Sequence, residues 1–544
     1  MKKRILLSTS VVALALWALV EAPAPGPGLA AWVPPGPLLV LEAGDFGSLL
    51  KDWNGSREKP AWVASANFAV FSQSRLYLRL ADAQTEFATA AGLPPDMDLL
   101  ESVAGSESAL ALYDIGNLQF LYITKLPSAR ALETALWRSR STYETRRAAG
   151  LDYFIRTDPA SRRVAAFAAA KDYLLLATRE DLMAGALTLL AGEPGATVAG
   201  ERWYAESVRR AGAAGDLRLV MNLPALAKSP HFRSYWIQRN VAEVREFDAG
   251  IADLRRQTGQ IREDRLLLRF DRPEAEPPDA AASAAALRLV PDDAGFAQIW
   301  TKPAPAAAMG LLYKKVLAPG PGAPPPSLTA PPAAVTGISG SEADLETRID
   351  EPPLVTSAGD TVLAALRAMM EAPPIAPLTA MLEVASSRED TGGVLVGIDT
   401  AVVLVGASSW DAAAVRKALA SVPEFGPLGH ITVEAHDRVL IVANSTALTG
   451  KIAARLSAAP SGRAVTYAAE FRHAAERGRF EKMMRLIDYS AADGEAKGDA
   501  HEPKFFSENI GSLSGVLGGV ESASLTTLDL GASVSETMTY TLAK

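Results

Sequence analysis

The chain has 544 residues, of which 49% are hydrophobic and 21% are charged, and this composition is typical of a globular protein. A chain longer than about 250–300 residues exceeds what one hydrophobic core supports, so we expect at least two domains. The formal net charge of −8 argues against nucleic acid as a partner, and the absence of cysteine excludes disulfides, thiolate catalysis and thiolate-bound metals.

The N-terminus has the pattern of an export signal. Residues 2–4 (KKR) precede a mainly apolar run, 5–20, which ends at a Pro/Gly-rich stretch. The run is slightly shorter than the about 17–25 residues that span a bilayer as a helix. Two interpretations stay open: a signal peptide cleaved after Ala24 or Ala30, or a hydrophobic helix retained as an anchor. Both predict an exported protein, either periplasmic or anchored in the inner membrane and facing the periplasm.

After this segment, short apolar runs alternate with helical patterns. Residues 37–42 predict a strand, and Asp45 is a suitable N-cap for the helix that follows. Residues 108–113 and 118–124 flank turn-forming residues and predict a hairpin. The remaining predicted elements are a helix capped by Ser128, strands at 151–157, 164–168 and 173–178, a helix at 179–190, a strand that runs into a helix at 217–237, and a closing strand at 264–270.

The same order of elements returns in the second half of the sequence. Residues 465–485 match 217–237 as a strand that runs into a helix, so that Leu223 aligns with Phe471. The hairpin returns at 393–398 and 401–407 around a turn at 399–400, and residues 369–388 are interpreted as a divergent, flexible region. The copy is completed by a helix capped by Asp411 and by strands at 431–435, 439–443, 522–530 and 533–542. Because several blocks recur in one order, we infer a duplicated module.

The predicted domain organisation follows from this duplication. Residues 1–30 are a signal peptide or membrane anchor, 31–270 the first domain, 271–286 a Pro/Ala-rich linker, and 287–544 the second domain, with a Pro-rich insertion at 317–335. The predicted fold class is α+β: two homologous domains, each a mainly antiparallel β-sheet with packed helices, preceded by an N-terminal hydrophobic helix.

Few residues could hold a metal. If the strand at 431–435 extends by one residue at each end, His430, Glu434 and His436 project on one face, where two imidazoles and a carboxylate could bind zinc. A solvent-facing sheet edge explains the same pattern without a metal. His473 and Glu476 lie three residues apart on a helix, and we interpret them as part of an exposed helix face.

No catalytic or cofactor signature occurs, so no catalytic residue and no cofactor are predicted. The S-x-x-K matches at 48–51 and 56–59 lack their partner motifs, and a P-loop, a dinucleotide fingerprint and H-E-x-x-H are all missing. The acidic clusters at 96–98 and 493–502 lack calcium-loop spacing. The arginine- and aromatic-rich region 202–272 is interrupted by acids, which favours ion-paired helices over a nucleic-acid surface.

The repeated order of elements, together with the export signal, resembles a family of two-repeat bacterial envelope proteins of unknown function. The resemblance covers most of residues 31–544, transfers no site residue and implies only a fold. We hypothesise a non-catalytic envelope protein that uses both domains to bind or scaffold an unknown envelope protein or ligand, with membrane contact only through its N-terminal segment. The alternatives are a hydrolase with a site assembled from distant residues, and a module that captures peptides on a long, unprotected edge strand.

Overall fold

The computed structural model describes residues 28–73, 75–93, 99–229, 244–312, 315–316, 377–389, 396–420, 431–460, 462, 464–479 and 515–543. Within them, 18 strands belong to a single sheet. The first ten are β1 (Leu39–Ala43), β2 (Ser108–Asp114), β3 (Gln119–Lys125), β4 (Glu144–Ala148), β5 (Leu151–Thr157), β6 (Val164–Ala170), β7 (Tyr173–Ala177), β8 (Leu217–Asn222), β9 (Ala249–Gln257) and β10 (Gln260–Leu268). The others are β11 (Phe296–Thr301), β12 (Leu378–Glu389), β13 (Val396–Gly406), β14 (Thr432–His436), β15 (Val439–Ala443), β16 (Tyr467–Phe471), β17 (Val520–Asp529) and β18 (Ser533–Leu542).

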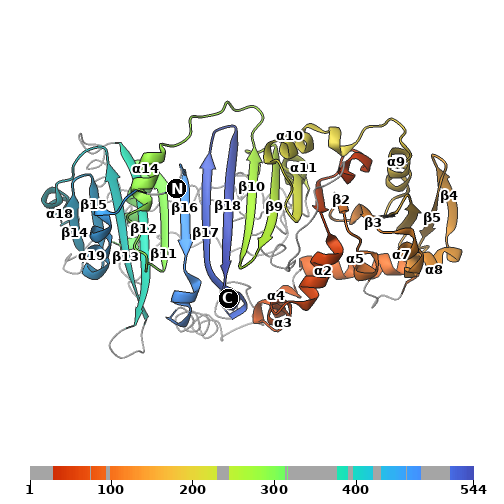
Figure 1. Cartoon of the computed structure of the whole chain (residues 1–544), viewed down its shortest axis with the longest axis horizontal. Coiled ribbons are helices and arrows are strands. Elements are labelled where there is room, and N and C mark those ends of the chain that lie inside the picture. The colour runs from red at the N-terminus through yellow and green to blue at the C-terminus, as the bar shows by residue number, and fades with distance from the viewer. Residues whose placement is uncertain are drawn as a thin grey trace, which may run out of the picture.

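All pairings in this sheet are antiparallel. From one edge to the other the strands lie in the order β4-β5-β6-β7-β3-β2-β1-β8-β9-β10-β18-β17-β16-β11-β12-β13-β15-β14. Figure 1 shows the sheet extending along the length of the molecule, with helices packed against it. This architecture confirms the predicted α+β class.

Counted outward from the central β10–β18 pair, the two halves have the same order of strands. One side runs β10, β9, β8, β1, β2, β3, β7 and β6, and the other runs β18, β17, β16, β11, β12, β13, β15 and β14. Strands β5 and β4 extend only the first side. The halves meet through a continuous register from Gln260↔Thr541 to Leu268↔Ser533, so they share one sheet.

The described helices are α2 (Phe46–Gly55), α3 (Glu58–Val63), α4 (Ala66–Phe71), α5 (Arg75–Ala91), α6 (Leu99–Val103), α7 (Ser128–Glu133), α8 (Ala135–Ser139), α9 (Glu180–Ala191), α10 (Arg202–Ala211), α11 (Leu223–Lys228), α14 (Ala280–Leu287), α15 (Pro305–Leu312), α18 (Ala412–Ala420) and α19 (Thr446–Ala454). Short 3₁₀-helices are η1 (Leu29–Trp32), η2 (Arg140–Thr142), η3 (Val198–Gly200), η7 (Arg455–Ser457) and η8 (Leu517–Gly519).

Helices cover both faces of the sheet toward its two ends. We call the face toward which Val40, Val220 and Ile441 point the front face. On it, η1, α9 and α10 bury the core of the first half, and α14 and α19 bury that of the second half. On the opposite back face, α5 to α8 cover the first half, and α15 and α18 cover the second. The strands at each end are therefore buried on both sides, as in β15, whose five residues are all buried.

Helix α9 illustrates how the local sequence builds these layers. Glu180 and Asp181 in its first turn favour the positive end of the helix dipole, and Gly192 ends the helix in a left-handed conformation with φ of 91°. Its buried side chains form the stripe that faces the sheet: Leu182, Met183, Ala186, Leu187 and Leu190.

Several predicted helix starts are confirmed by capping hydrogen bonds. The Asp45 carboxylate accepts from the backbone nitrogen of Ser48 at 2.9 Å, and that of Asp411 accepts from Ala413 at the same distance. Ser128 is the first residue of α7 and not its cap. The predicted linker, 271–286, is partly helical, because Asp279 caps α14, which begins at Ala280.

The hairpin predicted around 399–400 is wrong. Strand β13 continues through this position, and its partner is β12, which lies largely in the region interpreted as flexible. Asp399 is accommodated within the strand because its carboxylate forms an ion pair with Arg388 across the two strands at 2.6 Å and accepts the Ser445 hydroxyl at 2.9 Å. These tertiary partners outweigh the turn preference of Asp399. Strands β4 and β9 were also not predicted.

The N-terminal hydrophobic helix and the Pro-rich insertion at 317–335 lie outside the described residues. Leu29 and Ala30 are 3% and 2% exposed and belong to the front-face core of the first half, so the packed structure begins before residue 31. In the described part of the chain, no helix is long and apolar enough to cross a membrane. The predicted division into two homologous domains stays a prediction.

Candidate functional site

The middle of the front face carries a surface rich in hydroxyl groups. Residues directly opposite each other on paired strands point to the same face, and side chains alternate along each strand. By this register, the front-facing residues of β17 and β18 are mainly serines and threonines, and the apolar exception is Leu528, opposite Ser535. The front-facing hydroxyl residues of the paired stretch are Ser522, Ser524, Thr526, Ser535, Thr537, Thr539 and Thr541. We call these seven residues the hydroxyl surface.

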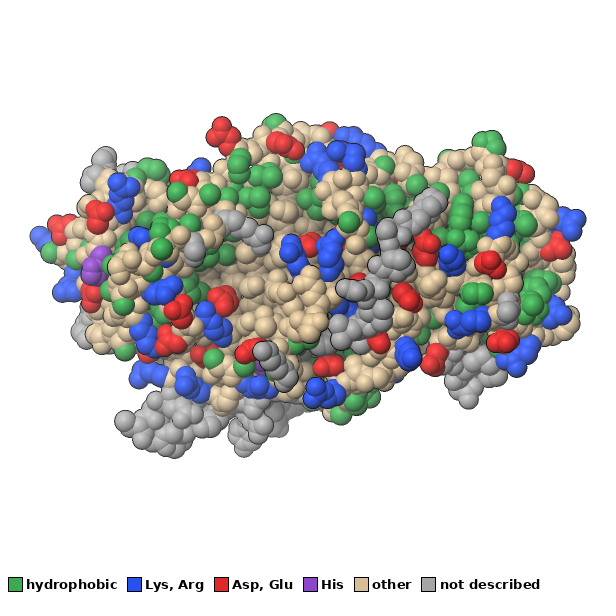
Figure 2. Space-filling model, viewed as in Figure 1, with side chains coloured by type: hydrophobic (Ala, Val, Ile, Leu, Met, Phe, Trp, Pro, Cys, Tyr) green, Lys and Arg blue, Asp and Glu red, His purple; other side chains and the backbone are tan. Residues whose placement is uncertain are grey.

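This surface lies in a gap between helices. On the first side α10 packs on β8, β9 and β10, and on the second side α14 packs on β11 and β12, whereas no described helix packs extensively on β17 or β18. Figure 1 shows the central strands side by side between α14 and α10. Figure 2 shows a hollowed region over them, in which neither hydrophobic nor charged side chains predominate.

Among the described residues, most of these hydroxyls have no hydrogen-bond partner. Thr537 donates to a carboxylate oxygen of Asp264 at 2.8 Å. In the described part of the chain, the other six form no side-chain hydrogen bond, and none is a buried unsatisfied atom. They are half-buried in the floor of the gap, yet their oxygens remain open to solvent. The surface thus offers hydrogen-bond donors and acceptors in two adjacent rows.

The sequence of β18 gives this strand a polar front face and a back face that packs in the interior. In its sequence, SVSETMTYTL, hydroxyl residues alternate with larger side chains. Val534 and Met538, on the back face, are each 7% exposed and pack in the interior, while the hydroxyls face forward. The prediction of a strand at 533–542 is confirmed, but its polar face was not recognised as a site. The alternation was visible in the sequence, whereas the neighbouring row on β17 depends on the register.

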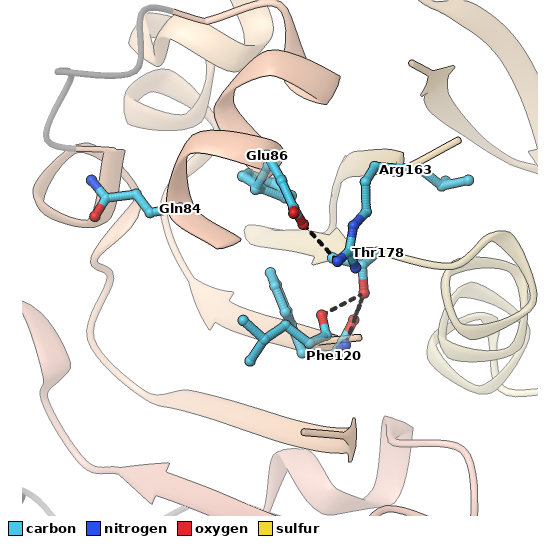
Figure 3. A pocket seen from close by; sticks show the side chains of 8 residues that line it. Gln84, Glu86, Phe120, Arg163 and Thr178 are labelled. Atoms are coloured by element: carbon cyan, nitrogen blue, oxygen red, sulfur yellow. Dashed lines mark hydrogen bonds and ion pairs between the residues drawn. The ribbon is translucent and has the colours of Figure 1, made fainter. Parts of the chain in front are cut away.

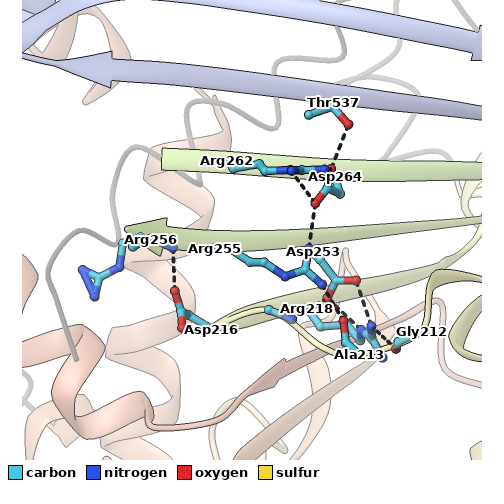
Figure 4. A network of polar contacts seen from close by, with 11 residues as sticks. Gly212, Ala213, Asp216, Arg218, Asp253, Arg255, Arg256, Arg262, Asp264 and Thr537 are labelled. Atoms are coloured by element: carbon cyan, nitrogen blue, oxygen red, sulfur yellow. Dashed lines mark hydrogen bonds and ion pairs between the residues drawn. The ribbon is translucent and has the colours of Figure 1, made fainter. Parts of the chain in front are cut away.

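Charged side chains border the hydroxyl surface on β9 and β10 (Figure 4). Asp264 accepts from Arg255 at 2.7 Å, from Arg262 at 2.9 Å, and from Thr537. Two guanidinium groups therefore share one carboxylate, which leaves this border with net positive charge. Asp264 is already bound by three donors, so it is poorly placed to act as a general base. Arg255 and Arg262 are 30% and 42% exposed and can still reach a ligand.

A buried ionic group lies next to this border. Arg218 on β8 makes two bonds of 2.8 Å to the Asp253 carboxylate on β9, with both side chains almost fully buried. Beside it, Tyr204 donates to Glu42 at 2.5 Å. Burial raises the pKa of the Glu42 carboxyl group, and burial followed by the charge of Glu42 raises that of Tyr204. These groups hold the first-half strands beside the hydroxyl surface, but they are closed to a ligand.

A pocket lies on the back face of the first half, beneath α5 (Figure 3). Its volume is about 250 Å³. The aromatic rings of Phe87 and Phe120 lie 5.8 Å apart at its wall, and Glu86 pairs with Arg163 at 2.5 Å. Thr178 accepts from the backbone nitrogen of Phe120 at 2.9 Å. The remaining lining residues are Gln84, Leu118 and Val164.

The structure brings together two of the three predicted metal ligands. Glu434 and His436 lie on strand β14 with Oε2 and Nε2 3.3 Å apart, and both are exposed. His430 lies outside the described residues. Within the described ranges, no group of three or more histidine, aspartate or glutamate side chains is arranged to hold a metal.

The exposed position predicted for His473 and Glu476 is wrong, since they are 5% and 3% exposed. The His473 ring contacts the backbone oxygen of Val520 at 3.2 Å, and the Glu476 carboxylate accepts from the backbone nitrogen of Ser387 at 3.0 Å. The helix that carries them packs against strands from distant parts of the chain. Its polar side chains serve that packing.

The outer strands bear on the peptide-capture alternative, which requires long, unprotected edges. At one end, β4 has five residues and carries exposed charges, including Arg146, which pairs with Glu144 at 2.9 Å. At the other end, β14 also has five residues, and Arg416 donates to the backbone oxygen of Val433 at 2.9 Å. Short strands that carry charged side chains, or a backbone oxygen that is already bonded, discourage the addition of another strand.

Comparisons with known proteins do not assign a family. No family model matches the chain, and no curated protein matches it. Similar solved structures include crystal form I of TP0453, which is 11% identical over 46% of this chain and 80% of that chain, with a TM-score of 0.23. Crystal form III of TP0453 is 10% identical over 47% of this chain and 82% of that chain, with a TM-score of 0.22. Similarity of this extent carries no argument about function.

Proposed function

We propose that this protein is an exported, non-catalytic cell-envelope protein that binds an extended glycan on the hydroxyl surface. The observation that carries the proposal is the two rows of hydroxyls on β17 and β18, six of which have no hydrogen-bond partner among the described residues. Half-buried hydroxyls that lack an internal partner can exchange hydrogen bonds with water for hydrogen bonds with a polar ligand. The pattern of residues 1–30 supports the exported location.

The charged border favours a glycan over other extended ligands. Guanidinium and carboxylate groups such as those of Arg255, Arg262 and Asp264 can bind the hydroxyls of a sugar, and the net positive charge also suits acidic sugars. The front-facing side chains of β17 and β18 form no row of apolar anchors for peptide side chains. We therefore prefer a polyhydroxylated polymer.

We also propose that the chain arose by duplication of one α+β module, giving two homologous domains joined edge to edge. The matching order of strands on the two sides of the β10–β18 pair supports this proposal. The hydroxyl surface then lies beside the seam, with β17 and β18 from one copy and the charged border from the other. Both copies contribute to one binding surface, which explains why the duplicated form would be kept.

A binding experiment tests the proposed function. Residues 28–544, purified as a soluble chain, are mixed with insoluble envelope glycan in a co-sedimentation assay, and soluble glycan fragments are titrated by calorimetry. The test variant replaces Thr526, Thr539 and Thr541 with valine, which removes hydroxyls but keeps the side-chain shape. Three lost hydrogen bonds, each worth about 0.5–1.5 kcal/mol, should weaken binding at least about tenfold.

The matched control replaces Thr145 and Thr432 with valine on the outer strands β4 and β14. This control should bind like the wild type. If the wild-type protein does not bind glycan, or if the triple variant binds as tightly as the wild type, there is no glycan site on the hydroxyl surface. The same preparation should show no turnover on ester, peptide, phosphate and glycan substrates. Turnover that a single serine or carboxylate substitution abolishes would overturn the non-catalytic assignment.

A further inference from the structure

We infer that the pocket beneath α5 is a second binding site, which takes one ring-sized apolar group bearing a neutral hydrogen-bonding head. It lies on the back face, whereas the hydroxyl surface is on the front face of the sheet. Its residues come from separate parts of the first half: Glu86 and Phe87 from α5, Phe120 from β3, Arg163 from the segment before β6, and Thr178 from the position directly after β7.

The volume and the aromatic walls of the pocket determine which apolar group a ligand can place in it. A volume of about 250 Å³ is larger than the roughly 150 Å³ apolar cavity that accommodates benzene in an engineered protein. Phe87 and Phe120 are tilted by 43° to each other and present ring surface to a third ring. Both side chains are half-buried and belong to the margin of the back-face core, so the wall does not depend on a mobile surface side chain.

The polar side chains of the pocket determine which charge a ligand can carry. Glu86 and Arg163 form an ion pair through their 2.5 Å contact, and Arg163 also donates to the backbone oxygen of Asn117. An anionic ligand would meet the Glu86 carboxylate, and a cationic ligand would meet the Arg163 guanidinium. A neutral head such as a hydroxyl group can donate to the first and accept from the second without disturbing the pair. The pair therefore selects against charge of either sign.

The binding test uses three small probes with the same ring and different charge: p-cresol, benzoate and benzylamine. The full-length chain is titrated with each probe and followed by saturation-transfer NMR. We expect saturable binding of p-cresol with a dissociation constant on the order of 1 mM, and at least about fivefold weaker binding of both ions. Equal binding of the three probes, or no saturable binding of p-cresol, would overturn the inference.

Four variants test the assignment of residues. Phe87→Ala should weaken p-cresol binding at least about tenfold, whereas Phe154→Ala, which removes the same side chain elsewhere in the back-face core, should leave it unchanged. Glu86→Gln should make benzoate the preferred ion, and Arg163→Gln should make benzylamine the preferred ion. Because these two changes act in opposite directions, a general loss of structure cannot produce both. Unchanged preferences in both variants would refute the selecting role of the pair.

Discussion

Asp253→Asn should destabilise the protein, because it leaves the buried guanidinium of Arg218 without the carboxylate that binds it. In the native chain, Asp253 accepts two bonds from Arg218 and one from the backbone nitrogen of Gly215, all between 2.8 and 2.9 Å. Asp253→Asn keeps the size of the side chain but removes its charge. Arg218, only 4% exposed, then remains charged without its hydrogen-bonded counter-ion.

The expected loss is about 3–5 kcal/mol in the free energy of unfolding, the usual cost of breaking a buried ion pair from one side. Equilibrium unfolding in urea, followed by circular dichroism, measures it. A second variant, with methionine at both 218 and 253, removes both charges and retains much of the packed volume. It should recover most of the lost stability, because two apolar groups leave no buried charge.

The chain offers a matched control for this experiment. Arg147 and Asp152 also pair across adjacent strands, at 2.7 Å, but their side chains are 68% and 53% exposed. Asp152→Asn should therefore leave the urea unfolding midpoint nearly unchanged, because solvent screens an exposed pair. If Asp253→Asn costs no more than Asp152→Asn, or if the double methionine variant is as unstable as Asp253→Asn, the cause is not the uncompensated charge of Arg218.

Three further predictions concern other parts of the chain. Burial raises the pKa of Glu42 in the folded protein, so ionisation of its carboxyl group destabilises the fold as the pH rises above the unfolded-state pKa near 4.5. Glu42→Gln should therefore stabilise the protein at pH 7 but not at pH 4, and an equal change in stability at both pH values would refute this. A chain that begins at residue 31 loses the buried Leu29 and Ala30, and should be about 2–4 kcal/mol less stable than one that begins at 28; equal urea midpoints would contradict this. Cleavage at a protease site inserted between residues 276 and 277, in the exposed connection, should leave the halves together in size-exclusion chromatography, because β10 and β18 hold them; separate elution would refute that role for the seam.

Local sequence signals predicted the parts of this fold that depend on neighbouring residues. Asp45 and Asp411 identified helix starts, because a carboxylate that caps a helix bonds to nitrogens two or three residues away. Strands such as β5, β15 and β18 were recognised from alternation and β-branched residues, and their observed bounds match or nearly match the predicted ones. Each of these signals depends only on residues that are close together in the sequence.

The predictions that failed depended on distant partners. The sequence around Asp399 has turn character, and only Arg388 and Ser445 make an extended conformation favourable there. His473 and Glu476 have the spacing of one helix face, but whether that face is buried is decided by Val520 and Ser387. For the same reason, the pocket beneath α5 could not be predicted from the sequence, because its lining comes from α5, β3 and β6 and from the segments that flank the strands.

The position of the hydroxyl surface at the seam has a physical explanation. At each end of the sheet, helices bury apolar residues on both faces, and strands there cannot carry a polar face without losing the core. Strands β17 and β18 contribute no residue to the two front-face cores, so their front faces can remain polar while their back faces still pack. The two halves, joined at this edge, place the hydroxyls of one half beside the arginines of the other. Either half alone would instead expose an unpaired edge strand, which promotes aggregation. The joined sheet therefore protects this edge and assembles the proposed binding surface at the same place.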